Sequence, residues 1–189
     1  MNKAELLSLF QRCYAYQEGH FRLAGGKHTN RYVQCAHLTE HADVTEKVCR
    51  ALIEACGDTK AQVVVSPAIG GMIFGFEVSR LKNLRYVYTE RRDGAMILHR
   101  GFDIEKGTPV LVVEDVVTTG GSVREVMEIV RALGGNVVKV ACLVDRSGGK
   151  VDFGVPFVSL ISYEVEAWDE KGCPLCEKGT PLAKPVGRL

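Results

Sequence analysis

The sequence has almost no excess charge of either sign. Its 24 Lys and Arg residues against 23 Asp and Glu residues leave a formal net charge of +1 over 189 residues. A protein that binds nucleic acid or a membrane surface through its overall charge carries a clear basic excess. We therefore expect neither partner, and any anion-binding site must be local.

Long apolar runs and paired cysteine spacings are also missing. No run approaches the length needed to cross a bilayer, and the N-terminus lacks the basic and then apolar layout of a signal peptide. The seven cysteines are odd in number and show no small disulfide-scaffold spacing. These absences favour a cytoplasmic protein in which most cysteines are small core residues. With no internal repeat, low-complexity tract or linker, residues 1–189 are expected to form a single domain.

Short apolar strands alternate with helical patterns through the middle of the chain. Continuous apolar strands of this kind are typical of a parallel sheet covered by helices on both faces, which predicts an α/β fold. The strands are predicted at residues 62–66, 85–89, 110–113 and 137–144, and the helices at 70–81 and 122–133.

The N-terminal part differs from this alternation, and residues 1–40 are interpreted as an appendage to the sheet. Its predicted elements are a helix over residues 3–14, a loop through Gly19, a polar turn at 25–31 and a strand at 32–35, followed by a helix at 42–56.

The run from Val110 to Ser122 joins a predicted strand to two acids and a Gly-rich turn. Ligands of parallel sheets gather at the carboxyl ends of the strands, where Glu114 and Asp115 are expected to lie. The two glycines before Ser122 allow backbone N–H groups to converge on an anion at the start of a helix. The acids can accept hydrogen bonds from a vicinal diol such as that of ribose. The run therefore predicts a site for a sugar and its phosphate.

A Gly-Gly turn before a capped helix, with solvated acids, is the simpler alternative. The combination of strand, paired acids and hydroxyl-rich turn favours the binding site. The run matches neither the GxxxxGK[ST] nor the GxGxxG pattern, so ATP and dinucleotide sites lose support. The predicted contacts are Glu114, Asp115, Val116, Val117, Thr118, Thr119, Gly120, Gly121 and Ser122.

The same run resembles the signature with which type I phosphoribosyltransferases bind phosphoribosyl pyrophosphate (PRPP). The resemblance implies a parallel sheet flanked by helices, with an N-terminal hood over the base site, here residues 1–40. It also implies Mg²⁺ that is held mainly by PRPP, with no protein side chain expected as a metal ligand. A homodimer is implied because a mobile loop reaches the neighbour's site in this family.

Further segments are similar to the orotate-specific branch of that family. Residues 19–32 resemble its hood, residues 66–71 its pyrophosphate loop, and residues 90–94 the start of its mobile loop. Asp145-Arg146 matches the place where an arginine of that branch meets orotate. The resemblance implies that orotate contacts Lys27, Thr118 and Arg146, that PRPP also contacts Arg91 and Arg92, and that Asp115, Arg92 and Arg100 are the catalytic residues.

Three positions that carry lysine in many such relatives are occupied here by Ala24, Gly70 and Ala95. A branch with other phosphate contacts, drawn from Lys27, Arg92, His99 or Arg100, explains this best. A PRPP-binding regulator without catalysis and a transferase for purines or uracil are the alternatives. His28 and His99 are more often surface or structural histidines than proton carriers.

The Gly-, Pro- and Lys-rich tail from residue 168 to 189 is predicted to be an irregular or short helical wrap. Its Cys173-x-x-Cys176 spacing could supply half of a zinc site, yet no second Cys or His pair at ligand spacing follows it. A redox role needs a thioredoxin-like βαβ unit, which this segment lacks. The pair is interpreted as a structural turn.

Overall fold

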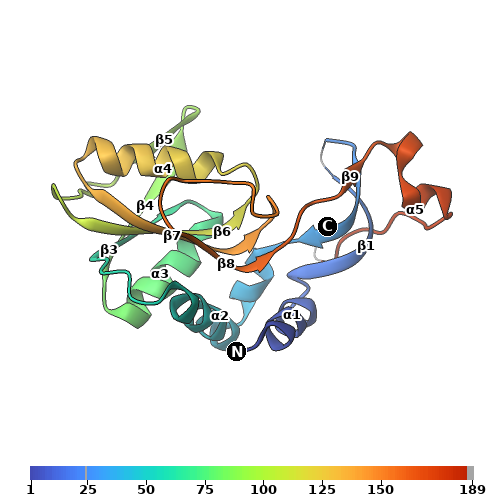
Figure 1. Cartoon of the computed structure of the whole chain (residues 1–189), viewed down its shortest axis with the longest axis horizontal. Coiled ribbons are helices and arrows are strands. Elements are labelled where there is room, and N and C mark those ends of the chain that lie inside the picture. The colour runs from blue at the N-terminus through green and yellow to red at the C-terminus, as the bar shows by residue number, and fades with distance from the viewer. Residues whose placement is uncertain (24, 187–189) are drawn as a thin grey trace.

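A computed structural model describes residues 1–23 and 25–186 (Figure 1). Six strands form the larger sheet: β3 (Val63–Pro67), β4 (Arg85–Arg92), β5 (Ala95–Leu98), β6 (Pro109–Val117), β7 (Asn136–Asp145) and β8 (Phe157–Ser162). Their order is β5-β4-β3-β6-β7-β8. Neighbouring strands are parallel except β4 and β5, which form an antiparallel hairpin. The predicted α/β class is confirmed.

Helices cover both faces of this sheet. Figure 1 shows α4 on one face and α2 and α3 on the other. The described helices that pack on the sheet or its edge are α1 (Lys3–Arg12), α2 (Ala42–Cys56), α3 (Gly70–Lys82) and α4 (Gly121–Ala132). Within these described parts, no helix is both long enough and apolar enough to cross a membrane.

Alternate residues of each central strand face opposite helical layers. Val64 packs in the cluster that contains the buried side chains of α2 and α3, whereas Val63 and Val65 pack in the cluster beneath α4. Leu111 and Val112 divide between the same two clusters. Because side chains alternate along a strand, a sheet buried on both faces needs the continuous apolar runs found here.

A smaller antiparallel sheet stands beside the larger one. It consists of β1 (Tyr16–Arg22), β2 (His28–Val33) and β9 (Ala167–Trp168). Figure 1 shows the C-terminal segment returning beside the N-terminal hairpin, with η2 (Glu170–Gly172) and α5 (Pro174–Glu177) at its outer end. We call this small sheet with residues 170–180 the hood.

Five sequence interpretations need correction. The loop predicted through Gly19 is strand β1, and β2 begins at His28 rather than at residue 32. Their polar residues give no two-residue apolar period, so the sequence carries no local strand signal, although β2 pairs with β1 along its length and with β9 at His28 and Thr29. Residues 90–92, predicted to begin a loop, end strand β4 and pair with β5.

The other two corrections concern α1 and β6. The N-terminal helix is not an appendage, since Leu6, Leu9 and Phe10 are buried in the same cluster as α2. Strand β6 runs on to Val117, beyond its predicted end, because Glu114, Val116 and Val117 also find partners on β7.

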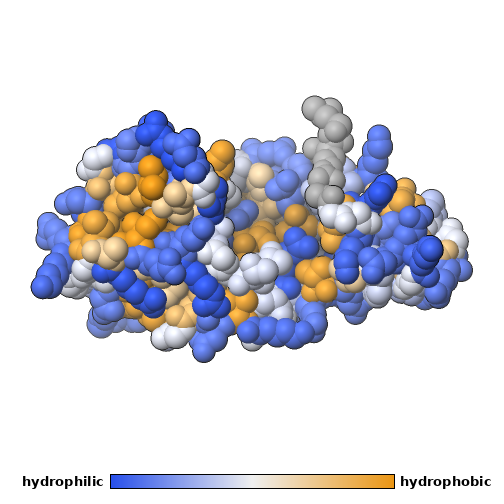
Figure 2. All heavy atoms as spheres, turned by 90° about the horizontal axis from the view of Figure 1, so that it is seen from above, coloured by the Kyte–Doolittle hydropathy of each residue, from blue (hydrophilic) through white to orange (hydrophobic). Residues whose placement is uncertain are grey.

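Seen from the side of α4, the surface is largely hydrophilic, with apolar side chains gathered at the end that holds α4 and β5 (Figure 2). A groove of about 380 Å³ lies between these two elements and is lined in part by Met96, Ile129 and Ala132.

Candidate active site at the end of β6

A pocket of about 350 Å³ opens at the carboxyl end of β6. This is the edge at which parallel sheets bind ligands, because loops there lead into helix N-termini. The pocket is built from the end of β4, the end of β6, and the loop and first turn that begin α4. Its lining residues are Arg91, Glu114, Val116, Val117, Thr118, Thr119, Gly120, Gly121, Ser122, Val123 and Glu125.

The loop between β6 and α4 has the backbone of an anion cradle. Gly120 has φ +78° and ψ 10°, a left-handed conformation that glycine adopts without strain. A Cβ atom there would lie 2.9 Å from the ring of Phe153, so the position is closed to side chains for a second reason. Since α4 begins at Gly121, the N–H groups of its first turn have no partner within the helix and face this loop.

Glu114 is buried at the base of the pocket, with 6% of its surface exposed. Its Oε1 accepts a hydrogen bond from the backbone N–H of Asp115 at 3.0 Å. Burial, aided by the neighbouring charge of Asp115, raises the pKa of Glu114 to about 9. At neutral pH Glu114 is therefore protonated and can donate as well as accept, whereas the half-buried Asp115 stands nearer to solvent.

The first turn of α3 approaches this acid pair without side chains, because its first two residues are glycines. A Cβ atom on Gly70 would lie 2.6 Å from Oδ1 of Asp115. A Cβ atom on Gly71 would lie 2.9 Å from Oε1 of Glu114 and from the carbonyl oxygen of Val113. A lysine at position 70 would displace Asp115, which gives a physical reason for glycine there.

The three predicted arginines lie on or beside the β4–β5 hairpin. Arg91 lines the pocket, donates to the carbonyl of Gly94 at 2.6 Å and forms an ion pair with Glu125. Arg92 lies 2.9 Å from His99 through Nη1 and Nε2, and Arg100 pairs with Glu90 at 3.4 Å. Of the three, Arg91 alone is among the described residues that line the pocket.

Arg146 follows β7, the strand next to β6. Its backbone N–H donates to the carbonyl of Val117 at 2.7 Å, so its loop is attached directly to the end of β6. The side-chain Nε is buried and has no hydrogen-bond partner among the described residues. A buried guanidinium nitrogen without a protein acceptor indicates a place where a ligand or water supplies one.

Asp145 holds this loop and was not singled out from the sequence. Its buried carboxylate accepts from the N–H and hydroxyl of Ser147 at 2.8 and 2.6 Å, from the N–H of Gly149 at 3.0 Å and from the hydroxyl of Ser162 at 3.0 Å. The sequence signal is the Asp-x-Ser-Gly-Gly turn, in which an aspartate accepts from backbone two residues on.

The remaining predicted contacts lie at separate places. Thr118 is exposed on the pocket loop, whereas Lys27 is an exposed residue of the hood that pairs with Asp169 at 3.9 Å. Asp115 and Arg92 are not among the described pocket-lining residues. Ala24, one of the three positions without lysine, lies outside the described residues.

Comparisons with known proteins agree with this site. The family described as "Phosphoribosyl transferase domain" matches residues 37–176. The chain therefore belongs to the phosphoribosyltransferase family.

Proteins similar to the chain over its full length show to which branch of the family it belongs. The orotate phosphoribosyltransferase of Caldanaerobacter subterraneus is 47% identical over 188 residues, covering 100% of this chain and 99% of that protein. The enzyme of the same name from Heliobacterium modesticaldum is 48% identical over 190 residues, covering 100% of both. The crystal structure of orotate phosphoribosyltransferase from Aeropyrum pernix matches with a TM-score of 0.73 and 26% identity, covering 83% of this chain and 93% of that one. Within its family, the chain stands among the orotate phosphoribosyltransferases.

Proposed function

We propose that this protein transfers the 5-phosphoribosyl group of PRPP to orotate, giving orotidine 5′-monophosphate and pyrophosphate in the synthesis of UMP. The observation that carries the proposal is the pocket lined by Glu114 and residues 116–122 at the end of β6, in a chain 47% identical over its length to an orotate phosphoribosyltransferase. All the PRPP contacts predicted in residues 114–122 except Asp115 thus line one cavity.

The 5′-phosphate binds in the loop before α4. The backbone N–H groups of the first turn and the hydroxyls of Thr118, Thr119 and Ser122 are the donors, and the positive end of the 12-residue helix favours the anion. The left-handed Gly120 turns the loop so that these donors face one point.

The ribose diol binds to the acid pair. Asp115 accepts from one hydroxyl, while the protonated Glu114 can donate to an oxygen and accept from another hydroxyl. Displacement at C1 passes through a state with positive charge on the ribose, so a carboxylate near the ring stabilises it more than the ground state.

Magnesium fits the pyrophosphate side of the pocket. Arg91 is the one cationic side chain among the described lining residues, and Glu125 already neutralises it in part. The pyrophosphate charge thus needs a further cation, and the oxygens of PRPP are the ligands that Mg²⁺ prefers. Bound Mg²⁺ would be held mainly by PRPP itself and would supply positive charge to the departing pyrophosphate. Arg91, Arg92 and Arg100 are proposed to add charge from the β4–β5 hairpin.

Orotate is proposed to bind between Thr118, Arg146 and Lys27. The unpartnered Nε of Arg146 supports this assignment, because a guanidinium can form two parallel hydrogen bonds to a carboxylate. Lys27 belongs to the hood, which is proposed to cover the orotate site.

We also propose that residues 1–189 form one domain and that the protein is a cytoplasmic homodimer. Residues 1–40, the predicted hood segment, contribute β1 and β2 to the hood. The shared cluster of α1 with α2 supports the single domain. All seven cysteines are free of disulfides, in agreement with a reducing compartment. Ile69, Ile73 and Phe76 expose 83%, 46% and 55% of their surfaces at α3, which is apolar surface that a second copy would cover.

The test is turnover of orotate by the purified protein with PRPP and Mg²⁺, followed by the change in orotate absorbance. We expect turnover with orotate and none with adenine or uracil. Turnover on a purine or on uracil in place of orotate would contradict the base assignment. Tight PRPP binding without transfer to any base would identify a regulator instead.

A further inference from the structure

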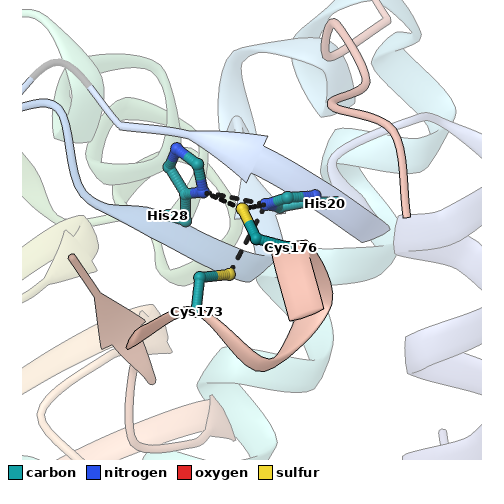
Figure 3. A group of neighbouring side chains, drawn as sticks. All are labelled: His20, His28, Cys173 and Cys176. Atoms are coloured by element: carbon teal, nitrogen blue, oxygen red, sulfur yellow. Dashed lines mark hydrogen bonds between the residues drawn. The ribbon is translucent and has the colours of Figure 1, made fainter. Parts of the chain in front are cut away.

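Two histidines of the hood hairpin face two cysteines of the tail. His20 belongs to β1 and His28 to β2, whereas Cys173 directly precedes α5 and Cys176 lies within it. Figure 3 shows the two imidazole rings and the two thiols pointing toward a common centre. One ligand atom from each residue lies within 4.8 Å of the others. The cluster is separate from the pocket at the end of β6, whose described lining includes none of the four.

The separations are close to those of a tetrahedral zinc site. Zinc binds imidazole nitrogen at about 2.0–2.1 Å and thiolate sulfur at about 2.3 Å, so tetrahedral ligand atoms are about 3.3–3.8 Å apart. Nε2 of His20 lies 2.9 Å from Nδ1 of His28 and 3.5 and 3.7 Å from Sγ of Cys173 and Cys176. Sγ of Cys176 lies 3.2 Å from Nδ1 of His28.

Hydrogen bonds alone do not account for this arrangement. Nδ1 of His20 lies 2.7 Å from the carbonyl oxygen of Thr180, and a carbonyl only accepts, so Nδ1 carries the hydrogen. In the neutral ring, Nε2 then has one lone pair, which can accept one hydrogen. Three polar atoms crowd that lone pair, from His28, Cys173 and Cys176. A cation at the centre satisfies all four groups at once.

Burial and a supporting contact complete the site. His20 and His28 are each 2% exposed and Cys173 is 0% exposed, so bulk water does not solvate these groups. The bond from His20 to Thr180 is the outer contact that metal-binding histidines generally make, since it orients the ring and fixes the tautomer. Residues 173–180 thus supply two sulfur atoms and this acceptor.

We propose that His20, His28, Cys173 and Cys176 bind one structural zinc ion that ties the N-terminal hairpin to the C-terminal tail. Four protein ligands leave no open position, which is the coordination of a structural rather than a catalytic zinc. The mixed nitrogen and sulfur set suits zinc and disfavours Mg²⁺ or Ca²⁺. Binding releases the two thiol protons to solvent, leaving two thiolates that neutralise Zn²⁺.

The Cys-x-x-Cys pair is therefore more than the predicted structural turn. No second Cys or His pair at ligand spacing follows it in the sequence, and its proposed partners precede it at residues 20 and 28. The antiparallel pairing of β1 with β2 and of β2 with β9, together with the hydrogen bond from the N–H of Ala183 to the carbonyl of His20, brings the two ends together.

The test is the metal content of the full chain, expressed without a polyhistidine tag and purified with reductant but without chelator. We expect one zinc per chain by elemental mass spectrometry. Cys176→Ser and His28→Gln are expected to lose the zinc, whereas the matched controls Cys13→Ser and His37→Gln, which alter half-buried residues outside the cluster, keep it. This readout does not depend on transferase activity, so its failure is distinct from that of the proposed function.

Cobalt provides a second measurement on the unaltered chain in case a variant fails to fold. Protein grown in cobalt medium is expected to show a thiolate-to-cobalt charge-transfer band and the intense visible absorption of tetrahedral Co²⁺. Wild-type protein with neither zinc nor these bands would overturn the proposal. Zinc retained by both cluster variants, or a Cys173–Cys176 disulfide in the reduced preparation, would overturn it as well.

Discussion

Gly70 and Asp115 approach each other so closely that a Cβ atom on the glycine would lie 2.6 Å from Oδ1 of the aspartate. The first turn of α3 and the end of β6 therefore fit together only because position 70 has no side chain. A Cβ atom on Gly71 would instead lie 2.9 Å from the backbone carbonyl oxygen of Val113, which cannot rotate away as a side chain can. Gly70 thus leaves room for the Asp115 side chain, whereas Gly71 leaves room for the backbone of β6.

We predict that Gly70→Ala impairs catalysis more than stability, and Gly71→Ala the reverse. Alanine at position 70 moves the Asp115 side chain and should raise the KM for PRPP about tenfold, which is about 1.4 kcal/mol. Alanine at position 71 presses on backbone and should lower the free energy of unfolding by about 1–3 kcal/mol. Steady-state kinetics and urea unfolding of both variants check this. Equal losses of stability would refute the distinction.

Asp115→Asn is expected to weaken PRPP while the fold stays intact. The amide removes the charge that accepts from the ribose diol, and hydrogen bonds to charged groups contribute about 1.5–3 kcal/mol. The KM for PRPP should therefore rise roughly tenfold to a hundredfold, with an unchanged circular dichroism spectrum. A fully active variant would show that the diol binds elsewhere.

Arg146→Ala is expected to act on the other substrate. The buried Nε of Arg146 has no acceptor among the described residues, which leaves it available to orotate. Loss of the side chain should therefore raise the KM for orotate roughly tenfold or more and leave the KM for PRPP nearly unchanged. Arg124→Ala, which removes an exposed arginine bonded to the carbonyl of Asp152, is the control. A similar rise in both KM values would place Arg146 outside the orotate site.

Glu114→Gln should change how stability depends on pH. Because the pKa of Glu114 is raised from 4.5 to about 9 in the folded chain, the folded state holds this proton where the unfolded state has lost it. The contribution of protonated Glu114 to the free energy of unfolding is therefore fully present below pH 4.5 and is lost as the pH rises toward 9. Glutamine does not ionise, so the free energy of unfolding should fall with pH more steeply in the wild type, by several kcal/mol over this range. Urea unfolding without substrates at several pH values tests this; parallel curves would contradict it.

Asp145→Ala should destabilise the loop that carries Arg146. The change leaves the N–H groups of Ser147 and Gly149 without their acceptor, which should cost about 3 kcal/mol of unfolding free energy. Asp152→Ala, at an exposed aspartate that accepts from Gly154, should cost less than about 0.5 kcal/mol. Comparable losses in the two variants would show that Asp145 has no special structural role.

The sequence by itself determined the elements whose signals are local. Helix α2 was predicted with its observed bounds, Ala42–Cys56, because its apolar residues recur at helical spacing and Gly57 ends it. The central strands were predicted because a sheet buried on both faces requires continuous apolar runs. The phosphate loop was predicted for a similar reason, since its acids, hydroxyls and glycines are consecutive in the chain.

Only the tertiary structure decided the features that depend on residues far apart in sequence. The hood forms because β2 pairs with β9 across most of the chain, and this pairing brings His20 and His28 to Cys173 and Cys176. Burial between neighbouring strands and helices is the largest cause of the raised pKa of Glu114, and the adjacent Asp115 adds to it. Sequence patterns report which residues can form a helix, strand or turn, whereas burial and long-range contact arise only when those elements pack.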